Sequence, residues 1–138
     1  RLEYLNRPIM LRRLGLCMLL FCMLHVSFLA QAQEGSRWTA AEIASLPQYC
    51  QDKMGNINNA QWGGYFGRDI WVHFHHFCYG LVYFSRATTT IDRQRRSRSV
   101  KLGIRQFDYV MNVWPANFSL YKEAQVYKQQ LEMMRNWN

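Results

Sequence analysis

The segment from Ile70 to about Thr88 constrains the fold more than any other, because its apolar residues occur on every side of a helical projection. A helix with that pattern is buried nearly all round, so other helices must surround it. No segment shows a convincing period-two alternation of polar and apolar residues, which is typical of a strand. The sequence therefore predicts an all-α fold with this segment at its centre.

Local signals predict short helical segments and a loop ahead of the central helix. Thr39 and Glu42 have the spacing of a capping box, which marks a helix start. Pro47 interrupts that helix or opens a second one, since proline cannot donate a hydrogen bond inside a helix. The range 54–68 is rich in Gly and Asn, so we expect a loop there, after which Asp69 can cap the central helix.

Two further helices are predicted after the central one. Asp92 can cap a helix that continues until Pro115 stops it. The last helix extends from Ser119 to about Trp137, with Lys, Glu and Gln on one side and apolar residues on the other. The apolar side consists of Leu120, Ala124, Tyr127, Leu131 and Met134.

The beginning of the chain has the order of a secretory signal peptide. Met10 is followed by two arginines, by an apolar run of about seventeen residues, and by a small-x-small sequence that ends at Ala32. We therefore expect residues 1–9 to be upstream translated residues and residues 10–32 to be a signal peptide cleaved after Ala32. Residues 33–138 would then form one helical domain in the periplasm or outside the cell.

The chain is basic, with a formal net charge of +8 and a pI near 9.6. Cleavage after Ala32 would remove four Arg and one Glu, which leaves a charge of +5. Charge of this sign favours acidic partners, but it bears on association rather than on the fold. We expect a protein or peptide partner or an acidic polymer, and no specific nucleic acid, because a secreted chain meets little of it.

Cys50 and Cys78 are the two cysteines that remain after the expected cleavage. In an oxidising compartment a single disulfide is the simplest pairing, and we predict one between them. Free thiols or a metal role are the alternatives, because sequence alone does not show whether two sulfur atoms meet.

The central segment contains WVHFHHFCYGL, from Trp71 to Leu81, in which three histidines and a cysteine occur within six positions. At about 100° per residue, His73 and His76 face one side of a helix, while His75 and Cys78 face the other. One helix therefore cannot direct all four groups at a single tetrahedral zinc ion. We expect packing histidines, no cofactor and no catalysis, since the segment offers no partner carboxylate.

A metal- or haem-binding protein is the alternative interpretation of this cluster. A three-ligand site needs a group from elsewhere, and Cys50 together with His75 and Cys78 is the best candidate set. The pair His73 and His76 is the other candidate. The chain contains no C-x-x-C-H sequence for haem attachment.

A second pattern in the same region consists of Gly80, Tyr83, Gly103, Phe107, Val110 and Pro115. It resembles the tetratricopeptide repeat (TPR), a pair of antiparallel helices that stacks into a solenoid. His76 stands where that family usually has Trp, Gly103 stands where Ala is usual, and the spacing from Gly80 to Gly103 is about eleven residues longer than the repeat allows. The resemblance covers about residues 71–137 and extends to bacterial secreted proteins that contain such repeats.

What the resemblance implies is a helix pair that packs closely at its glycines, with Tyr83 and Phe107 in the groove, His76 beside Gly80 and more buried than His73, and Pro115 at the turn. A non-enzymatic scaffold for protein–protein interaction outside the cytoplasm is the implied function. It needs no chemistry.

The longer linkage carries DRQRRSRS, from Asp92 to Ser99. Its arginines can bind phosphate, sulfate or an acidic partner, or they can form an ordinary solvated helix turn. These arginines are Arg93, Arg95, Arg96 and Arg98.

The last helix also carries apolar residues that face away from the helix before it. Val126, Met133 and Trp137 have no partner in the predicted packing. We therefore expect either that the chain continues past Asn138 or that this helix mediates self-association.

Overall fold

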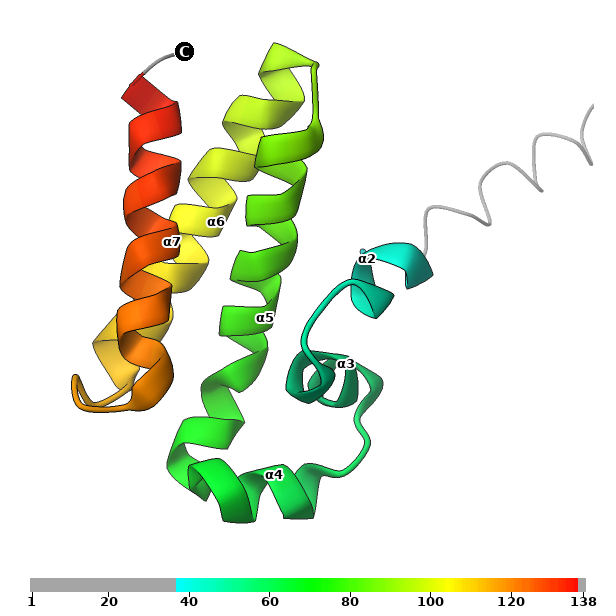
Figure 1. Cartoon of the computed structure of the whole chain (residues 1–138), viewed down its shortest axis with the longest axis vertical. Coiled ribbons are helices and arrows are strands. Elements are labelled where there is room, and N and C mark those ends of the chain that lie inside the picture. Colours follow the sequence, from blue (N-terminus) through cyan, green and yellow to red (C-terminus); the bar gives the residue numbers. More distant parts are fainter. Residues whose placement is uncertain (1–36, 137–138) are drawn as a thin grey trace, which may run out of the picture. The chain divides into compact units, whose positions relative to one another are not determined.

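Six helices make up the part of the protein that the structure describes, residues 37–136 of a computed structural model (Figure 1). They are α2 (Ala40–Ala44), α3 (Gln48–Gly55), α4 (Asn59–Phe66), α5 (Arg68–Thr89), α6 (Arg93–Val113) and α7 (Ser119–Asn136). Since this part contains no strand, the all-α prediction is confirmed. None of its helices is long and apolar enough to span a membrane. The expected signal peptide, its cleavage site and Trp137 lie outside the described residues.

α5 is the central helix of the unit that begins at Thr39, as its sequence predicts. It packs most extensively against α6, and α3 and α4 each contact it as well. α6 in turn packs against α7. Only residues 90–92 connect α5 to α6, so these helices run antiparallel, and Figure 1 shows α7 returning beside α6. The side chains that are fully withdrawn from water include Phe74, Phe77, Phe107 and Leu131.

The helix starts predicted from Thr39 and Asp92 are confirmed. The Thr39 hydroxyl accepts from the Glu42 backbone N–H at 3.2 Å, and the Glu42 carboxylate accepts from the Thr39 N–H at 2.8 Å. Asp92 Oδ1 accepts from the Arg95 backbone N–H at 2.7 Å. α6 ends two residues before Pro115, which agrees with a proline stop.

The range 54–68 contains a helix, so the prediction of a loop there is wrong. Asn56 and Asn58 adopt left-handed backbone conformations, with φ of 57° and 53°, and turn the chain tightly between α3 and α4. The buried carboxylate of Asp52 then holds the turn, because it accepts from Asn58 Nδ2 at 2.9 Å and from Trp62 Nε1 at 2.8 Å. Tertiary packing therefore overrides the weak helix preference of this segment.

The central helix starts slightly earlier than predicted. Gly67, with φ of 94°, occupies the N-cap position without a side-chain hydrogen bond, and Asp69 lies inside the first turn. A glycine suits that backbone conformation because it has no Cβ to clash.

α5 and α6 approach each other closely at their glycines. A β-carbon on Gly103 would lie 3.3 Å from the Cβ of Tyr83 and 2.6 Å from Cδ1 of Leu131 on α7. Phe107 and Val110 on the same face of α6 are fully buried. The extra length between Gly80 and Gly103 is not a loop, because it continues both helices, which are 22 and 21 residues long.

Cys50 on α3 and Cys78 on α5 form a disulfide, with their sulfur atoms 2.08 Å apart. Both cysteines are fully buried. The predicted pairing is therefore present, and it fixes α3 to the middle of the central helix.

Candidate functional site

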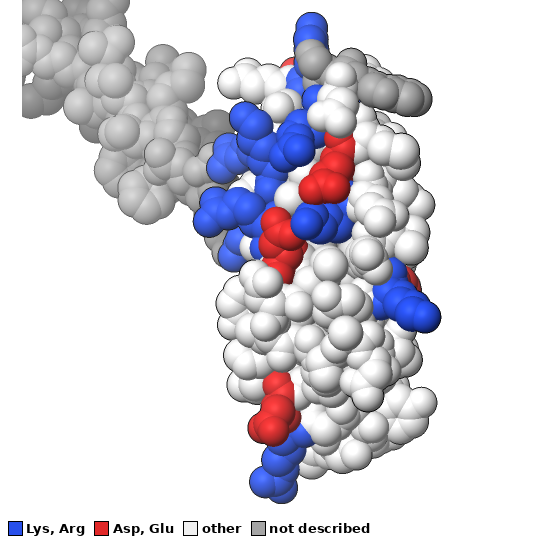
Figure 2. Space-filling model, turned by 90° about the vertical axis from the view of Figure 1, so that its left-hand side faces the viewer, with Lys and Arg blue, Asp and Glu red and all other residues white. Residues whose placement is uncertain are grey.

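The arginines singled out in the sequence begin α6, but they do not act as one group. Arg93, Arg95 and Arg98 are exposed, whereas Arg96 turns back and donates two hydrogen bonds, both at 3.1 Å, to the Thr90 carbonyl. Arg96 therefore serves the connection between α5 and α6. Figure 2 shows Lys and Arg side chains gathered on the upper part of the molecule, with some Asp and Glu side chains among them, while the lower part is mostly uncharged.

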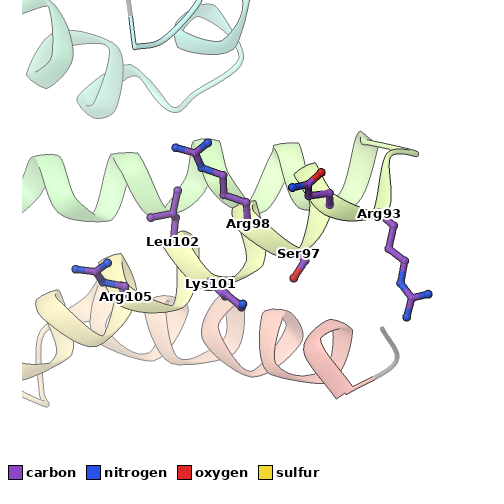
Figure 3. A pocket seen from close by; sticks show the side chains of 7 residues that line it. Arg93, Ser97, Arg98, Lys101, Leu102 and Arg105 are labelled. Atoms are coloured by element: carbon purple, nitrogen blue, oxygen red, sulfur yellow. The ribbon is translucent and has the colours of Figure 1, made fainter.

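Four exposed cations follow one side of α6, and we call them the basic face of α6: Arg93, Arg98, Lys101 and Arg105. Together with Gln94, Ser97 and Leu102 they line a shallow groove of about 720 Å³. Figure 3 shows these side chains along the exposed side of the helix. The sequence interpretation missed Lys101 and Arg105. Their spacing of eight and twelve residues from Arg93 places them about 80° and 120° around the helix from it, at about 100° per residue, so all three lie within one half of the helix surface.

No carboxylate lines the groove, and among residues 37–136 no Asp or Glu lies within ion-pair distance of the basic face. The nearest acidic groups in sequence are already engaged: Asp92 caps the helix, and Asp108 accepts from Lys128 Nζ at 2.6 Å. The four cations therefore have no carboxylate partner among the described residues, which favours an anion supplied from outside.

The three histidines form a half-buried row on α5 rather than a core cluster. His76 Nδ1 lies 2.8 Å from Gln106 Oε1, and its ring lies tilted against that of Tyr109, with centroids 3.8 Å apart. His73 Nδ1 lies 3.0 Å from the Tyr109 hydroxyl. His76 and His73 are both half-buried, and the atoms that would lie nearest a β-carbon on Gly80 belong to Phe107. His76 is therefore not one of the fully buried core residues, and its greater burial relative to His73 stays a prediction.

The candidate ligand set of His75, Cys50 and Cys78 is not available, because both sulfur atoms are bonded to each other. Among the described residues no three His, Cys, Asp or Glu side chains stand close enough together to hold a metal ion. His75 Nδ1 lies 3.1 Å from the Val72 carbonyl, and burial together with the neighbouring His76 lowers the pKa of its imidazole.

Comparison of the chain with protein-family models, with curated protein sequences and with solved structures finds no match.

Proposed function

We propose that this protein is a non-enzymatic TPR-like scaffold that acts outside the cytoplasm and binds an acidic segment of a protein partner along the basic face of α6. The observation that carries the proposal is the unneutralised charge of Arg93, Arg98, Lys101 and Arg105, which line one groove without a carboxylate. Side chains of opposite charge on a partner would complete these ion pairs and would speed the encounter.

The length of the basic face fits a short peptide segment. From Arg93 to Arg105 the helix rises by about 18 Å, at about 1.5 Å per residue. An extended chain covers that length with roughly five or six residues, at about 3.3 Å each. Alternate acidic side chains of such a segment would point at the groove, while Leu102 and Ser97 offer a partly apolar floor.

The rigidity of α6 supports a binding role. Its buried side rests on α5 and α7 through fully buried residues such as Phe107 and Val110, so the cations are presented from a fixed backbone. A preorganised surface loses less conformational entropy when it binds. The alternative of a metal- or haem-binding protein has lost its cysteine ligands to the disulfide and retains only the histidine row.

Fluorescence anisotropy with a labelled Asp/Glu-rich peptide tests this function. In the test variant Arg98→Gln, Lys101→Gln and Arg105→Gln are combined. The control combines Arg95→Gln, Lys122→Gln and Arg135→Gln, which are also exposed and remove the same charge outside the groove. We expect the test variant to lose affinity by about tenfold or more, the control to lose much less, and added salt to weaken binding.

Equal losses in the two variants would mean that only net charge matters and would overturn the proposal. A sulfated polysaccharide that binds the protein far more tightly than every acidic peptide would also overturn it, in favour of a polymer ligand. Circular dichroism spectra of both variants establish that the helices are retained.

A further inference from the structure

A second cavity, of about 360 Å³, lies between α3, α4 and the first turns of α5. Figure 1 shows α3 and α4 beside this end of the central helix, well away in sequence from the basic face of α6. Its volume is near the lower end of the range for small-molecule sites, roughly 300–1,000 Å³. Two of its lining residues are cations, Lys53 and Arg68, and no carboxylate lines it.

Lys53 is held in place inside this cavity. Its ammonium donates to the Trp71 carbonyl at 2.6 Å and lies 4.4 Å from the centroid of the Trp71 ring. Burial lowers the pKa of Lys53, and no anionic group of the described residues offsets that effect. The side chain is therefore a positioned cation that is partly withdrawn from water and lacks a counter-ion.

The carboxylate that precedes Lys53 in the chain, Asp52, is bonded elsewhere. It is only 2% exposed and accepts from Gln48 Nε2 at 2.7 Å in addition to its bonds from Asn58 and Trp62. These three neutral donors occupy its oxygens, so it does not neutralise Lys53. An anion that enters the cavity would meet Lys53 without competition from the protein.

The amide oxygens that line the cavity already accept hydrogen bonds from the protein. Trp71 Nε1 donates to Asn59 Oδ1 at 2.9 Å, and Asn59 Nδ2 donates to Asn56 Oδ1 at 2.7 Å. Because its Oδ1 already accepts, Asn56 can offer a ligand only its amide N–H groups, which are donors. The side-chain groups that remain for a ligand are thus all donors: the Lys53 ammonium, the Arg68 guanidinium, the Asn56 amide N–H groups and the second N–H of Asn59.

An apolar surface completes the cavity. Trp71, Ala60 and Val72 line it. Trp71 is fixed by its bond to Asn59, by stacking on Phe66 and by a tilted ring contact with Phe74. A bare inorganic anion would leave this surface without a partner. A molecule with both an oxyanion and a small organic body would use all of it.

We infer that this cavity binds a small organic carboxylate. Lys53 and Arg68 hold the carboxylate, with Asn56 as an additional donor, and the body of the ligand lies against Trp71 and Ala60. The inference does not depend on the function proposed for α6, because the two sites share no residue.

Nuclear magnetic resonance of ¹⁵N-labelled protein tests the site, with the Trp71 indole N–H as the reporter. The probes are succinate, benzoate, the neutral diamide succinamide, and inorganic phosphate. We expect succinate or benzoate to shift the Trp71 signal in a saturable way and succinamide to leave it unchanged. Lys53→Gln and Arg68→Gln should each weaken binding by about tenfold or more, which is the usual effect of losing a charge-assisted hydrogen bond.

A further variant guards against a loss that comes from misfolding. Ala60→Leu fills the cavity, keeps a good helix former in α4 and leaves the polar network intact, so it should abolish binding while the spectrum stays dispersed. Lys122→Gln on α7 and the triple variant of the basic face of α6 should bind as the parent does. The inference is overturned if no organic carboxylate shifts Trp71, if phosphate binds as tightly as they do, or if Ala60→Leu still binds.

Discussion

Gly80 on α5 lies directly under the ring of Phe107 on α6, so that a β-carbon built on Gly80 would stand 2.6 Å from Cε1 of that ring. Real β-carbons do not approach other atoms so closely, and Phe107 is fully buried and has no room to retreat. The Phe107 ring can therefore pack against α5 only because Gly80 has no β-carbon.

We predict that Gly80→Ala destabilises the protein by about 1–2 kcal/mol. Overpacking a core costs about 1–3 kcal/mol, and the better helix preference of Ala returns at most about 1 kcal/mol of that cost. Gly64→Ala is the matched control, because a β-carbon there meets nothing within 4 Å. It should stabilise by about 0.5–1 kcal/mol. Urea denaturation of both variants tests this account. It is contradicted if the two denaturation midpoints shift in the same direction from that of the parent.

The sequence predicted those features of the fold that depend on neighbouring residues. The caps at Thr39 and Asp92 need only a side chain three residues from its partner, and the pattern shows that spacing. Helix α4 was missed because its formation depends on Asp52, which lies in the helix before it and anchors Trp62. Short-range propensity contains no information about such an anchor.

The candidate sites could likewise be predicted only where they depend on residues close in the sequence. The position of Lys101 on the basic face of α6 follows from helical spacing alone and was available to sequence reasoning. The cavity beside Lys53 was not, because it requires α3 to place that ammonium against Trp71, eighteen positions further along the chain. The pairing of Cys50 with Cys78 was predictable only because no other cysteine remained after the expected cleavage.

The position of His76 leads to a second prediction. Since it is half-buried and lies against Gln106 and Tyr109 at the surface, His76→Ala should cost less than about 1 kcal/mol. Phe107→Ala empties a fully buried site and should cost about 3–5 kcal/mol. Chemical denaturation of both variants gives the comparison. If His76→Ala lowered the free energy of unfolding as much as Phe107→Ala, His76 would have to be a core residue.

The disulfide between Cys50 and Cys78 provides a third prediction. The two residues are 28 positions apart, and closing a loop of that length stabilises a domain by about 2–4 kcal/mol. Reduction of the 33–138 fragment should lower its denaturant midpoint accordingly. Mass spectrometry of the unreduced fragment should find it two hydrogen atoms lighter than the reduced form. Stoichiometric labelling of two thiols without reductant would show that the bond is absent.

Exposed apolar residues on α7 lead to a fourth prediction. Val126 and Met133 are 50% and 55% exposed and lie seven positions apart, on one side of the helix. We expect the 33–138 fragment to self-associate through this side of α7. Combining Val126→Gln with Met133→Gln should shift it toward the monomer in light scattering without loss of helix. Gln125→Ala and Gln129→Ala, at exposed polar positions of the same helix, are the control. A parent fragment that is already monomeric at high concentration would refute the prediction.

The ion pair between Glu42 and Arg86 gives a fifth prediction, on acid stability. Arg86 Nη2 donates to Glu42 Oε2 at 2.9 Å, Arg86 Nε donates to Oε1, and these bonds lower the pKa of Glu42 from 4.5 to about 2. A carboxyl with a depressed pKa in the folded state contributes stability that is fully present above pH 4.5. That stability is lost as the pH falls toward 2. The side chains are 22% and 34% exposed, so solvent screening limits the contribution to about 1 kcal/mol.

Glu42→Gln should therefore reduce the free energy of unfolding at pH 6 and make it fall less steeply between pH 4.5 and 2, where the two proteins should converge. Gln still suits the capping box with Thr39, so the start of α2 is retained. Asp52, whose pKa is lowered chiefly by its hydrogen bond from Asn58, adds an acid slope of the same sign to both proteins and cancels in their difference. Glu132→Gln is the control of equal charge change. Urea titrations across this range decide the matter, because a difference between parent and Glu42→Gln that is independent of pH would show that Arg86 does not depress the pKa of Glu42.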